Sequence, residues 1–99
     1  MSAMKRPCVY ILANRRNGTL YVGVTGNVLR RVWEHKAEVA EAFTRRYGIH
    51  TLVHVEFHAT MTEAIAREKQ IKKWRRAWKI ALIEQDNPDW RDIYDDING

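Results

Sequence analysis

Two short apolar runs near the N-terminus predict a β-hairpin. One lies within residues 9–13 and the other within residues 19–24, and the polar segment between them ends in Asn17-Gly18. Tyrosine and β-branched residues favour strands, and an Asn-Gly pair favours the tight turn that joins two antiparallel strands. Whether the tyrosines of the two strands share a face depends on the register of the hairpin.

A helix is expected directly after the hairpin. Asn27 is a favourable N-cap residue, and the apolar residues that follow it begin a stripe with helical spacing. We expect this helix to span about Val28 to Ala42. Arg31 and His35 are four residues apart on it, so their side chains share a face.

The second half of the chain predicts one more strand and further helices. In the strand, alternation places Val53 and Val55 on one face and Leu52 and His54 on the other. A capping box that begins at Thr60 marks the start of a helix. In chain order we expect a basic connection closed by a glycine at 43–48, a strand at 51–57 and a helix from about Met61. A kink or a third helix should follow from about Arg75 to Gln85, and then a short helical turn within 89–97.

Length and charge indicate one domain with a polyanionic partner. The 99 residues carry a net charge of +5, but residues 1–83 contain 16 Lys and Arg against 6 Asp and Glu, whereas residues 84–99 contain 1 Arg against 6 Asp and Glu. We expect a single α+β domain with a small three-stranded antiparallel or mixed sheet flanked by helices. Its core should lie at about 7–85, with an acidic tail at 86–99. A body this basic attracts polyanions.

The sequence favours a cytoplasmic protein without a membrane segment. No apolar run approaches the ~20 residues that a membrane span needs. The apolar stretch after Lys5 and Arg6 breaks at Asn14, too early for a secretory signal. The single cysteine, Cys8, fits a reducing compartment. It lies in a predicted strand, where a buried apolar role is favoured over a nucleophilic one.

Aromatic and histidine residues in the second half are expected to be structural. Trp74 and Trp78 are four residues apart, which favours a place in the core over stacking on nucleic-acid bases. Trp90 and Tyr94 are expected to pack back on the body. Three histidines alternate along the third strand without a second cluster of ligands, so we expect surface or rim positions and no zinc site for His50, His54 and His58.

One carboxylate stands in an unusual position. Glu68 lies inside the apolar stripe of the helix that begins near Met61, three residues before Ile71. A half-buried charge must be paired, hydrogen-bonded or bound to a cation. Pairing with Lys72, one turn further along, and binding of a divalent cation are both open at this point.

Several of these residues occur in an order that resembles a known signature. The pieces, in chain order, are Cys8-Val9-Tyr10, then Tyr21-Val22-Gly23, then Arg31, His35 and Glu68. The ordered set resembles the signature of the GIY-YIG (URI-domain) nuclease superfamily over roughly residues 7–85. It looks closest to the small stand-alone bacterial endonucleases of that superfamily. Two residues depart from the pattern: Cys8 replaces a glycine, and Val24 stands where the excision-repair relatives carry a lysine.

The resemblance implies a metal-dependent endonuclease that hydrolyses phosphodiester bonds in DNA, with structure-selective or weakly specific nicking linked to repair or recombination. It implies that Glu68 is the protein ligand of one divalent metal ion, Mg²⁺ or Mn²⁺. Arg31 would hold the scissile phosphate, and His35 would either take a proton from a tyrosine or contact the phosphate. Tyr10 and Tyr21 would act as the general base and as the group that orients the water, in an order that stays open.

Each of these assignments has an ordinary structural alternative. Tyr10 and Tyr21 can be strand residues with their hydroxyls at the rim, and Arg31 can be a surface residue of a basic helix. Gly23 lacks a Cβ and could let a phosphate or a metal approach the backbone, or it could simply end a strand.

Basic residues are expected to hold the substrate through its phosphates. Such contacts position a duplex without reading its sequence. The rival function is a nucleic-acid-binding domain that keeps the nuclease fold without turnover, RNA is an alternative polyanion, and a protein partner could supply targeting. The residues expected to bind nucleic acid are Arg45, Arg46, Lys72, Lys73, Arg75, Arg76 and Lys79.

Overall fold

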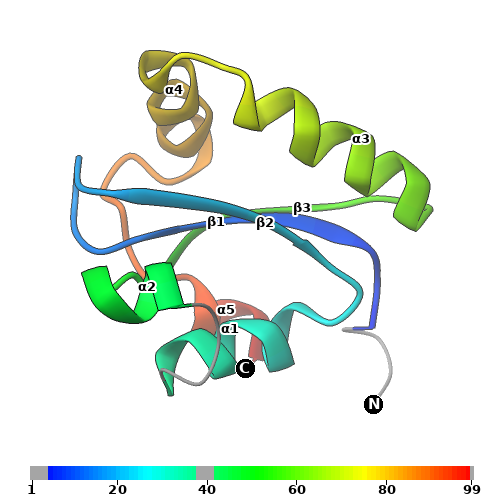
Figure 1. Cartoon of the computed structure of the whole chain (residues 1–99), viewed down its shortest axis with the longest axis horizontal. Coiled ribbons are helices and arrows are strands. Elements are labelled where there is room, and N and C mark those ends of the chain that lie inside the picture. The colour runs from blue at the N-terminus through cyan, green and yellow to red at the C-terminus, as the bar shows by residue number, and fades with distance from the viewer. Residues whose placement is uncertain (1–4, 38–41, 99) are drawn as a thin grey trace.

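A three-stranded antiparallel sheet in the order β2-β1-β3 forms the centre of the molecule (Figure 1). The computed structural model describes residues 5–37 and 42–98. Its strands are β1 (Cys8–Ala13), β2 (Leu20–Thr25) and β3 (Thr51–Phe57). The described residues also form five helices: α1 (Val28–Lys36), α2 (Ala42–Tyr47), α3 (Met61–Lys72), α4 (Arg76–Asp86) and α5 (Tyr94–Asn98). The predicted α+β architecture is confirmed.

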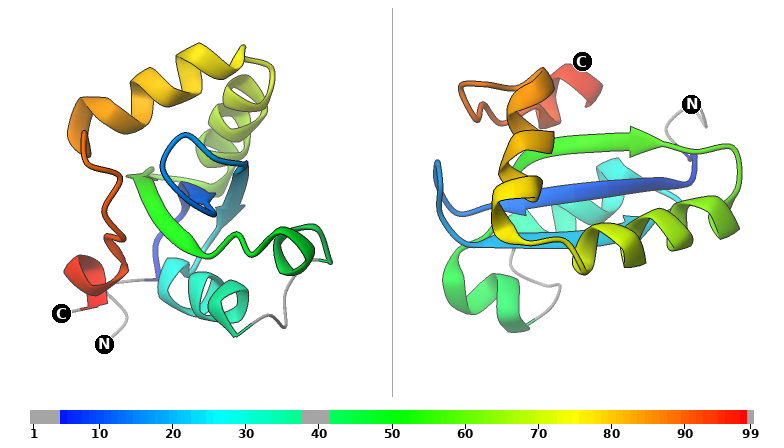
Figure 2. Two further views of the ribbon diagram at one scale, coloured as in Figure 1. Left: turned by 90° about the vertical axis from the view of Figure 1, so that its left-hand side faces the viewer. Right: turned by 90° about the horizontal axis from the view of Figure 1, so that it is seen from above.

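Helices cover both faces of the sheet. In Figure 1, α3 and α4 lie above the sheet and form an upper layer, and α1, α2 and α5 lie below it and form a lower layer. Seen from above, α3 runs beside β2, whereas α4 crosses the strands near the hairpin (Figure 2, right). Every residue of β1 is buried between the two layers. Burial on both faces explains why the β1 sequence is a continuous apolar run instead of an alternation.

Successive residues of β1 face opposite layers. Val9 and Ile11 pack with Ile71 and Ile83 in the upper layer, whereas Tyr10 packs in the lower layer with residues of α1. Both layers are mostly apolar, so a polar group in either of them needs a hydrogen-bond partner.

The hairpin forms as predicted. Asn17 adopts the left-handed conformation, with φ of 56°, which asparagine tolerates better than most residues. The side-chain oxygen of Asn14 accepts a hydrogen bond of 2.9 Å from the Thr19 amide and closes the loop. The register pairs Tyr10 with Gly23 and Leu12 with Tyr21. Directly paired residues share a face, so both tyrosines point into the lower layer.

Two helix starts are confirmed by their caps. The side-chain oxygen of Asn27 accepts from the Arg30 amide at 3.3 Å, and the hydroxyl of Thr60 accepts from the Glu63 amide at 3.1 Å. Each bond satisfies an amide that the first helical turn leaves without a partner. The predicted break near Arg75 is also confirmed, because α3 ends at Lys72 and α4 begins at Arg76.

The predicted end of the first helix and the segment after it are wrong. α1 ends at Lys36 instead of Ala42, and residues 38–41 lie outside the described residues. The segment expected to be a connection is the helix α2, closed by Gly48 at φ of 62°. A helix of six residues is too short to be stable alone, so its stability depends on tertiary contacts that local sequence does not reveal.

A bulge overturns the simple alternation predicted for β3. The β1 residue before Leu12 pairs with His54, and Leu12 itself pairs with Leu52, so β3 carries Val53 as an extra residue. As a result Leu52 packs in the lower layer with Val55, although it was expected on the other face.

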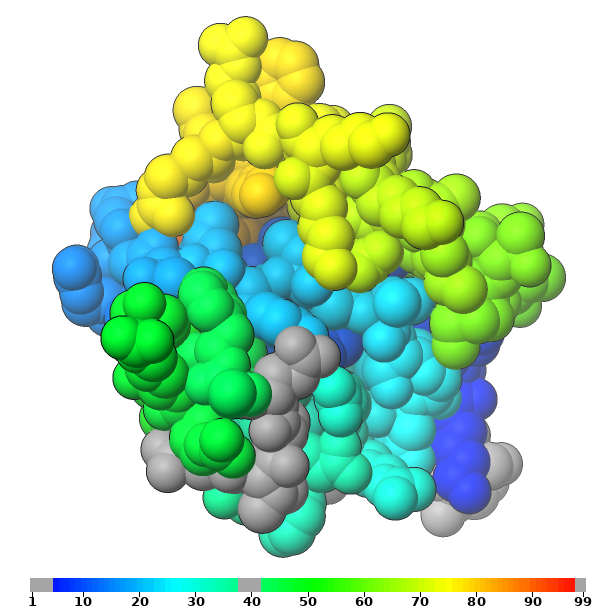
Figure 3. All heavy atoms as spheres, in the orientation of Figure 1, coloured from blue at the N-terminus to red at the C-terminus, as the bar shows by residue number. Residues whose placement is uncertain are grey.

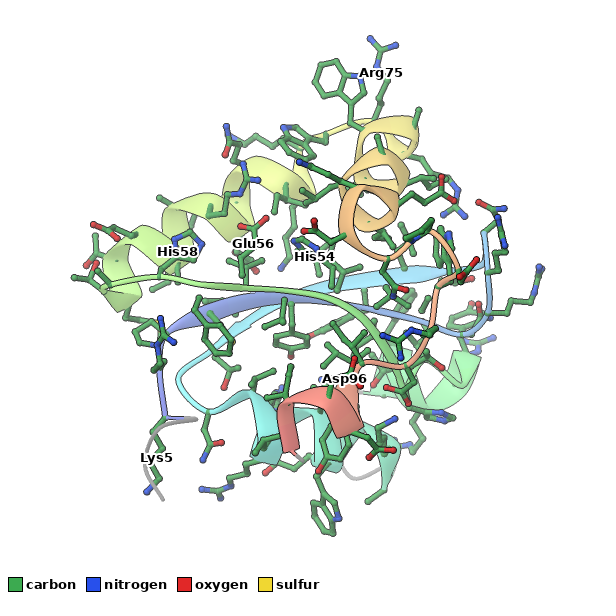
Figure 4. The ribbon with its side chains drawn as sticks, turned by 180° about the vertical axis from the view of Figure 1, so that it is seen from behind. Lys5, His54, Glu56, His58, Arg75 and Asp96 are labelled. Atoms are coloured by element: carbon green, nitrogen blue, oxygen red, sulfur yellow. The ribbon has the colours of Figure 1, made fainter. Side chains whose placement is uncertain are left out.

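The expected rim position of His54 is also wrong, because its side chain is buried. His54 Nε2 lies 2.9 Å from a carboxylate oxygen of Glu56, and Arg67 of α3 donates two hydrogen bonds of 2.9 and 3.1 Å to the same carboxylate. Figure 4 shows His58, Glu56 and His54 in a row between β3 and α3. Burial acts to raise the pKa of Glu56, but the hydrogen bonds with His54 and Arg67 outweigh it and lower the pKa to about 2.

The acidic C-terminal segment packs against the body. Trp90 is buried in the upper layer, and Tyr94 packs against the lower layer, which confirms the prediction for both. The Asn87 side chain donates to the Val53 carbonyl at 3.1 Å, and the Ile93 amide donates to the Leu52 carbonyl at 2.8 Å. The segment is therefore fixed to the edge strand β3 and leaves the opposite edge, β2, uncovered by it.

Two further expectations concern the role of Cys8 and a membrane-spanning helix. Cys8 is fully buried, and burial raises the pKa of its thiol to about 12, so it is protonated and unreactive at neutral pH. Its apolar role is confirmed. Within residues 5–37 and 42–98, no helix has the length and apolar content that a membrane span requires.

Candidate active site

Two phenol rings from adjacent strands meet in the lower layer. The ring centroids of Tyr10 and Tyr21 are 6.3 Å apart. Gly23 lies directly across from Tyr10, and a Cβ on Gly23 would lie 2.4 Å from Cζ and 2.5 Å from the hydroxyl oxygen of Tyr10. The missing Cβ of Gly23 therefore makes room for the Tyr10 ring, which is a physical reason for glycine that the sequence does not reveal.

His35 of α1 joins the two tyrosines. Its ring centroid lies 5.9 Å from that of Tyr10 and 5.2 Å from that of Tyr21. The Tyr10 hydroxyl is 3.1 Å from His35 Nε2, and the Thr44 hydroxyl of α2 is 3.0 Å from His35 Nδ1. Both ring nitrogens thus have a hydrogen-bond partner inside the core. Tyr10, His35 and Thr44 form a continuous chain of polar side chains, which we call the buried chain.

Sequence reasoning missed Thr44. It lies in a segment that was expected to be a connection. It stands nine residues after His35, a spacing that does not place two side chains on the same face of a helix. A buried histidine does require a second hydrogen-bond partner, but nothing in the local sequence identifies which hydroxyl supplies it.

Arg31 approaches the same cluster from α1. Burial acts to lower its pKa, but hydrogen bonds with Tyr10 and Glu34, together with the nearby phenols of Tyr10 and Tyr21, raise the pKa of Arg31 above its ordinary value. Its Nη1 atom donates to a carboxylate oxygen of Glu34 at 3.1 Å. The guanidinium also lines a surface pocket of about 380 Å³ at the junction of β2 and α1.

Exposure divides these four residues into two pairs. Tyr10 and His35 are each 1% exposed, so they do not reach a molecule bound at the surface. Tyr21 is partly exposed, and the side chain of Arg31 is 32% exposed. Tyr21 and Arg31 are therefore the members that a bound molecule can touch.

Glu68 belongs to the other layer. It lies on α3, which packs on the upper face against β2 and β1, and it is 9% exposed in the apolar stripe with Ala64 and Ile71. Its carboxylate forms an ion pair of 2.5 Å with Lys72. The first of the two alternatives for Glu68 is thus present in the structure. Glu68 and Arg31 reach the edge strand β2 from opposite faces of the sheet.

A metal ion at Glu68 would have few protein ligands. Within the part of the chain that the structure describes, no three or more His, Cys, Asp and Glu side chains form a metal-binding group. Magnesium keeps several water ligands and often takes only one or two protein carboxylates. A single shielded carboxylate beside an edge strand fits a hydrated magnesium ion and does not fit a fully protein-coordinated zinc ion.

The basic residues expected to bind nucleic acid gather near the hairpin end of the sheet. Figure 3 shows the edge strand β2 running between the helices of the two layers, with α2 on one side and the start of α4 on the other. Arg45 and Arg46 are exposed on α2, and Lys73 is exposed at the end of α3. Lys72 forms an ion pair with Glu68, and Arg76 donates hydrogen bonds to the carbonyl oxygens of the hairpin loop.

The expected core position of Trp78 is wrong. Its side chain is 51% exposed, and the Arg75 guanidinium lies 4.9 Å from its ring centroid. Figure 4 shows Arg75 projecting from the body at the start of α4. Trp74 does pack against the upper core. The break between α3 and α4 changes the direction of the helix, so an apolar stripe read through that break does not continue.

The partly exposed Tyr21 and Arg31, supported by the buried Tyr10 and His35, are suited to binding a phosphate ester and to activating a water molecule that attacks it. The chain belongs to the GIY-YIG family, because the family model described as the GIY-YIG catalytic domain matches residues 6–81. This family consists of nucleases, which hydrolyse phosphodiester bonds of nucleic acids and are generally metal-dependent.

Relatives of similar size carry the name UPF0213 protein. One from Syntrophus aciditrophicus is 38% identical over 87 residues, which cover 87% of this chain and 98% of the relative. One from Halobacterium salinarum is 44% identical over 67 residues, or 68% of this chain and 87% of the relative. One from Staphylococcus haemolyticus is 34% identical over 82 residues, or 83% and 99% of the two chains. No solved structure gives a significant match.

Proposed function

We propose that this protein is a metal-dependent endonuclease that nicks DNA at the cluster of Tyr10, Tyr21, Arg31 and His35. The observation that supports this most is the convergence of the two phenols, the imidazole and the guanidinium in one layer of the fold. Membership in the GIY-YIG family gives the reaction class, hydrolysis of a phosphodiester.

Arg31 is the proposed phosphate-binding residue. Its guanidinium is partly exposed and lines the pocket at the junction of β2 and α1. A planar guanidinium can hold two phosphate oxygens at once, which fixes the position of the phosphorus atom. Its positive charge also offsets the negative charge that builds up on the phosphate during attack.

Tyr21 is the proposed general base. It is the partly exposed phenol of the pair, and the charge of Arg31 lies close enough to interact with it. A free tyrosine has a pKa near ~10, and a nearby positive charge favours the phenolate. The phenolate takes a proton from a water molecule, the water oxygen bonds to phosphorus, and the bond from phosphorus to the leaving oxygen breaks. The leaving oxygen then takes a proton from solvent.

Tyr10 and His35 are proposed positioning residues. Both are buried, and they are linked to each other and to Thr44 by hydrogen bonds. A hydrogen-bonded group inside the core has a fixed orientation, so Tyr10 can hold the Arg31 guanidinium and His35 can hold the Tyr10 hydroxyl.

Glu68 is the proposed metal ligand. A divalent ion, Mg²⁺ or Mn²⁺, supplies charge neutralisation at the phosphate and at the leaving oxygen when it is bound. Glu68 suits this role because it is a shielded carboxylate on the helix that packs against β2. The ion pair with Lys72 keeps the carboxylate in place when no other cation neutralises it.

Contacts to phosphates would make cleavage weakly specific or dependent on DNA structure, as in repair and recombination, because such contacts carry no base information. We propose a cytoplasmic location, consistent with the buried reduced thiol of Cys8. A nucleic-acid-binding domain without turnover is the second candidate. The observation that favours it is the ion pair of Glu68 with Lys72, which occupies the expected metal ligand.

Nicking of supercoiled plasmid, with Mg²⁺, Mn²⁺ or a chelator, separates the two candidates. We expect the wild-type protein to produce nicked circles with either metal and none with the chelator. Glu68→Gln should abolish nicking, whereas Glu63→Gln on the exposed side of the same helix should leave it unchanged. Binding without nicking under all of these conditions would establish the second candidate. Equal nicking by the two variants would remove Glu68 from the mechanism.

A further inference from the structure

A second cationic pocket lies at the hairpin end of β2. It has a volume of about 550 Å³, and its lining includes Arg15 and Thr19 of the hairpin and Arg76 and Lys79 of α4. Arg31 lines a separate pocket at the other end of the same strand, beside Thr25. The two pockets therefore share no residue and lie at opposite ends of the edge strand β2.

Arg76 holds the walls of this pocket together. One of its Nη atoms donates to the carbonyl oxygens of Asn17 and Gly18 at 2.7 and 2.5 Å. The hairpin and α4 are far apart in sequence, so these bonds fix their relative position. Figure 3 shows the hairpin and the start of α4 side by side on the face that also exposes β2.

The positive charge of the pocket is not compensated by the protein. Across residues 5–37 and 42–98, no carboxylate forms an ion pair with Arg15, Arg76 or Lys79. The ion pairs seen among those residues lie elsewhere in the fold. Three cations around one concave surface concentrate a positive potential there, which attracts an anion.

We propose that this pocket binds a backbone phosphate of the nucleic acid, at a distance from the bond that is cut. Phosphate is the favoured ligand because the pocket offers guanidinium and ammonium groups and a threonine hydroxyl, which are the usual phosphate contacts. None of the described residues that line it is aromatic, so it offers no platform for stacking a base. The inference rests on the proposed function in taking a nucleic acid as the substrate.

The length of β2 sets the spacing between the two contacts. Leu20 lines the hairpin pocket and Thr25 lines the Arg31 pocket. Five steps along a strand at about 3.3 Å each give about 17 Å. Successive phosphates of a B-form strand advance about 3.4 Å along the axis. A substrate must therefore extend roughly five nucleotides past the cut, on one side, to reach the second pocket.

The test measures binding, so it does not require cleavage. Fluorescence anisotropy in the presence of a chelator would compare two labelled duplexes over a range of salt concentrations. One has about 20 base pairs, and the other has about 4 base pairs, cross-linked so that its strands stay paired and too short to reach both pockets. Arg15→Gln combined with Lys79→Gln should weaken binding of the long duplex about tenfold or more. It should lower the magnitude of the log–log salt slope by about 0.9, because one phosphate contact is lost. The short duplex should lose much less.

Arg16→Gln combined with Lys69→Gln is the matched control. It removes the same charge from exposed positions that do not line the pocket, so its salt slope should stay close to the wild-type value. Equal loss in the two double variants would show that only total charge matters, and the proposal would be wrong. The same conclusion follows if both duplexes weaken equally, or if an acidic peptide competes better than the duplex.

These outcomes are distinguishable from failure of the nuclease assignment. If the protein never nicks DNA but the pocket variant loses the salt slope that the control keeps, the second phosphate site stands and the cleavage mechanism does not. If the protein nicks DNA and the two double variants bind and nick equally well, the cleavage mechanism stands and the second phosphate site does not.

Discussion

Below the sheet, the core contains a chain of hydroxyl and imidazole groups, whereas above it the core contains carboxylates matched with cations. In the lower layer, Tyr10, His35 and Thr44 satisfy one another by hydrogen bonds. In the upper layer, Glu56 is matched with Arg67 and Glu68 with Lys72. Buried polar groups need partners in both cases. The difference is that the lower layer needs exact placement of several groups, whereas the upper layer needs opposite charge.

This difference separates the proposed chemistry from the proposed metal site. The groups proposed to contact the phosphate and the water lie in the lower layer, where they pack against β1 and β2. The carboxylate proposed to bind the metal lies in the upper layer, where it already has a cationic partner in Lys72. The edge strand β2 lies between them and, like β1, has residues facing both layers.

The largest effect should follow from removing the exposed charge of the lower layer. Arg31→Gln should reduce the nicking rate about 100-fold or more, because the positive charge that stabilises the transition state is lost. Arg91→Gln is the matched control, since Arg91 is also an exposed arginine paired with a carboxylate, that of Asp96, but it lines neither pocket. Similar rates for the two variants would exclude Arg31 from phosphate binding.

Gly23→Ala should displace the Tyr10 ring and so disturb the hydrogen bonds of the buried chain. Its new Cβ would lie within 2.5 Å of the Tyr10 ring, which is buried among the apolar residues of the lower layer. We expect a loss of about 1–3 kcal/mol in the free energy of unfolding, measured in urea. Gly26→Ala is the control, because its Cβ would meet only Met61 Cε at 3.5 Å. Equal stability of the two variants would contradict the tight contact.

Thr44→Val should remove the buried hydrogen bond between the Thr44 hydroxyl and His35 Nδ1. The hydroxyl is replaced by a methyl group of the same size, and the missing hydrogen bond in the core costs about 1–3 kcal/mol of stability. The nicking rate should fall with it, because His35 then positions Tyr10 less well. Thr62→Val on the exposed start of α3 should have little effect on either quantity. Unchanged stability of Thr44→Val would show that Thr44 does not contribute to the buried chain.

The free energy of unfolding should fall at low pH because of a carboxylate in the upper layer. The pKa of Glu56 is lowered from 4.5 to about 2 by its hydrogen bonds, so its contribution is complete above pH 4.5 and is lost as the pH falls towards 2. Urea unfolding between pH 5 and pH 2 should show a loss of about 1 kcal/mol that Glu56→Gln lacks, allowing for solvent screening of the pair. An identical pH dependence in the variant would contradict the role of this ion pair.

The sequence predicts much of this fold because its signals are local. The Asn-Gly turn, the caps at Asn27 and Thr60 and the spacing of Arg31 and His35 all act within a few residues. The ordered set of Tyr10, Tyr21, Arg31, His35 and Glu68 indicates the family. The fold confirms that the first four converge, and their chemical roles stay proposals.

The features that sequence reasoning missed depend on contacts between distant residues. Thr44 belongs to a helix that is stabilised by packing and not by its own sequence. A bulge in β3 moves Leu52 to the lower layer, and His54 is buried because helices cover both faces of the sheet. Trp78 is exposed because the chain turns between α3 and α4. The need for glycine at position 23 comes from a ring on the neighbouring strand. None of these contacts leaves a periodic signal in the chain.

The nicking rate of Tyr21→Phe tests the central claim most directly. The substitution removes one oxygen atom from the partly exposed phenol, and Tyr47→Phe removes the same atom from an exposed tyrosine of α2. We predict that, with Mg²⁺ and supercoiled plasmid, Tyr21→Phe loses activity on the order of 100-fold or more, while Tyr47→Phe keeps the wild-type rate. Wild-type nicking by Tyr21→Phe would show that this phenol is not the base and that the proposed mechanism is wrong.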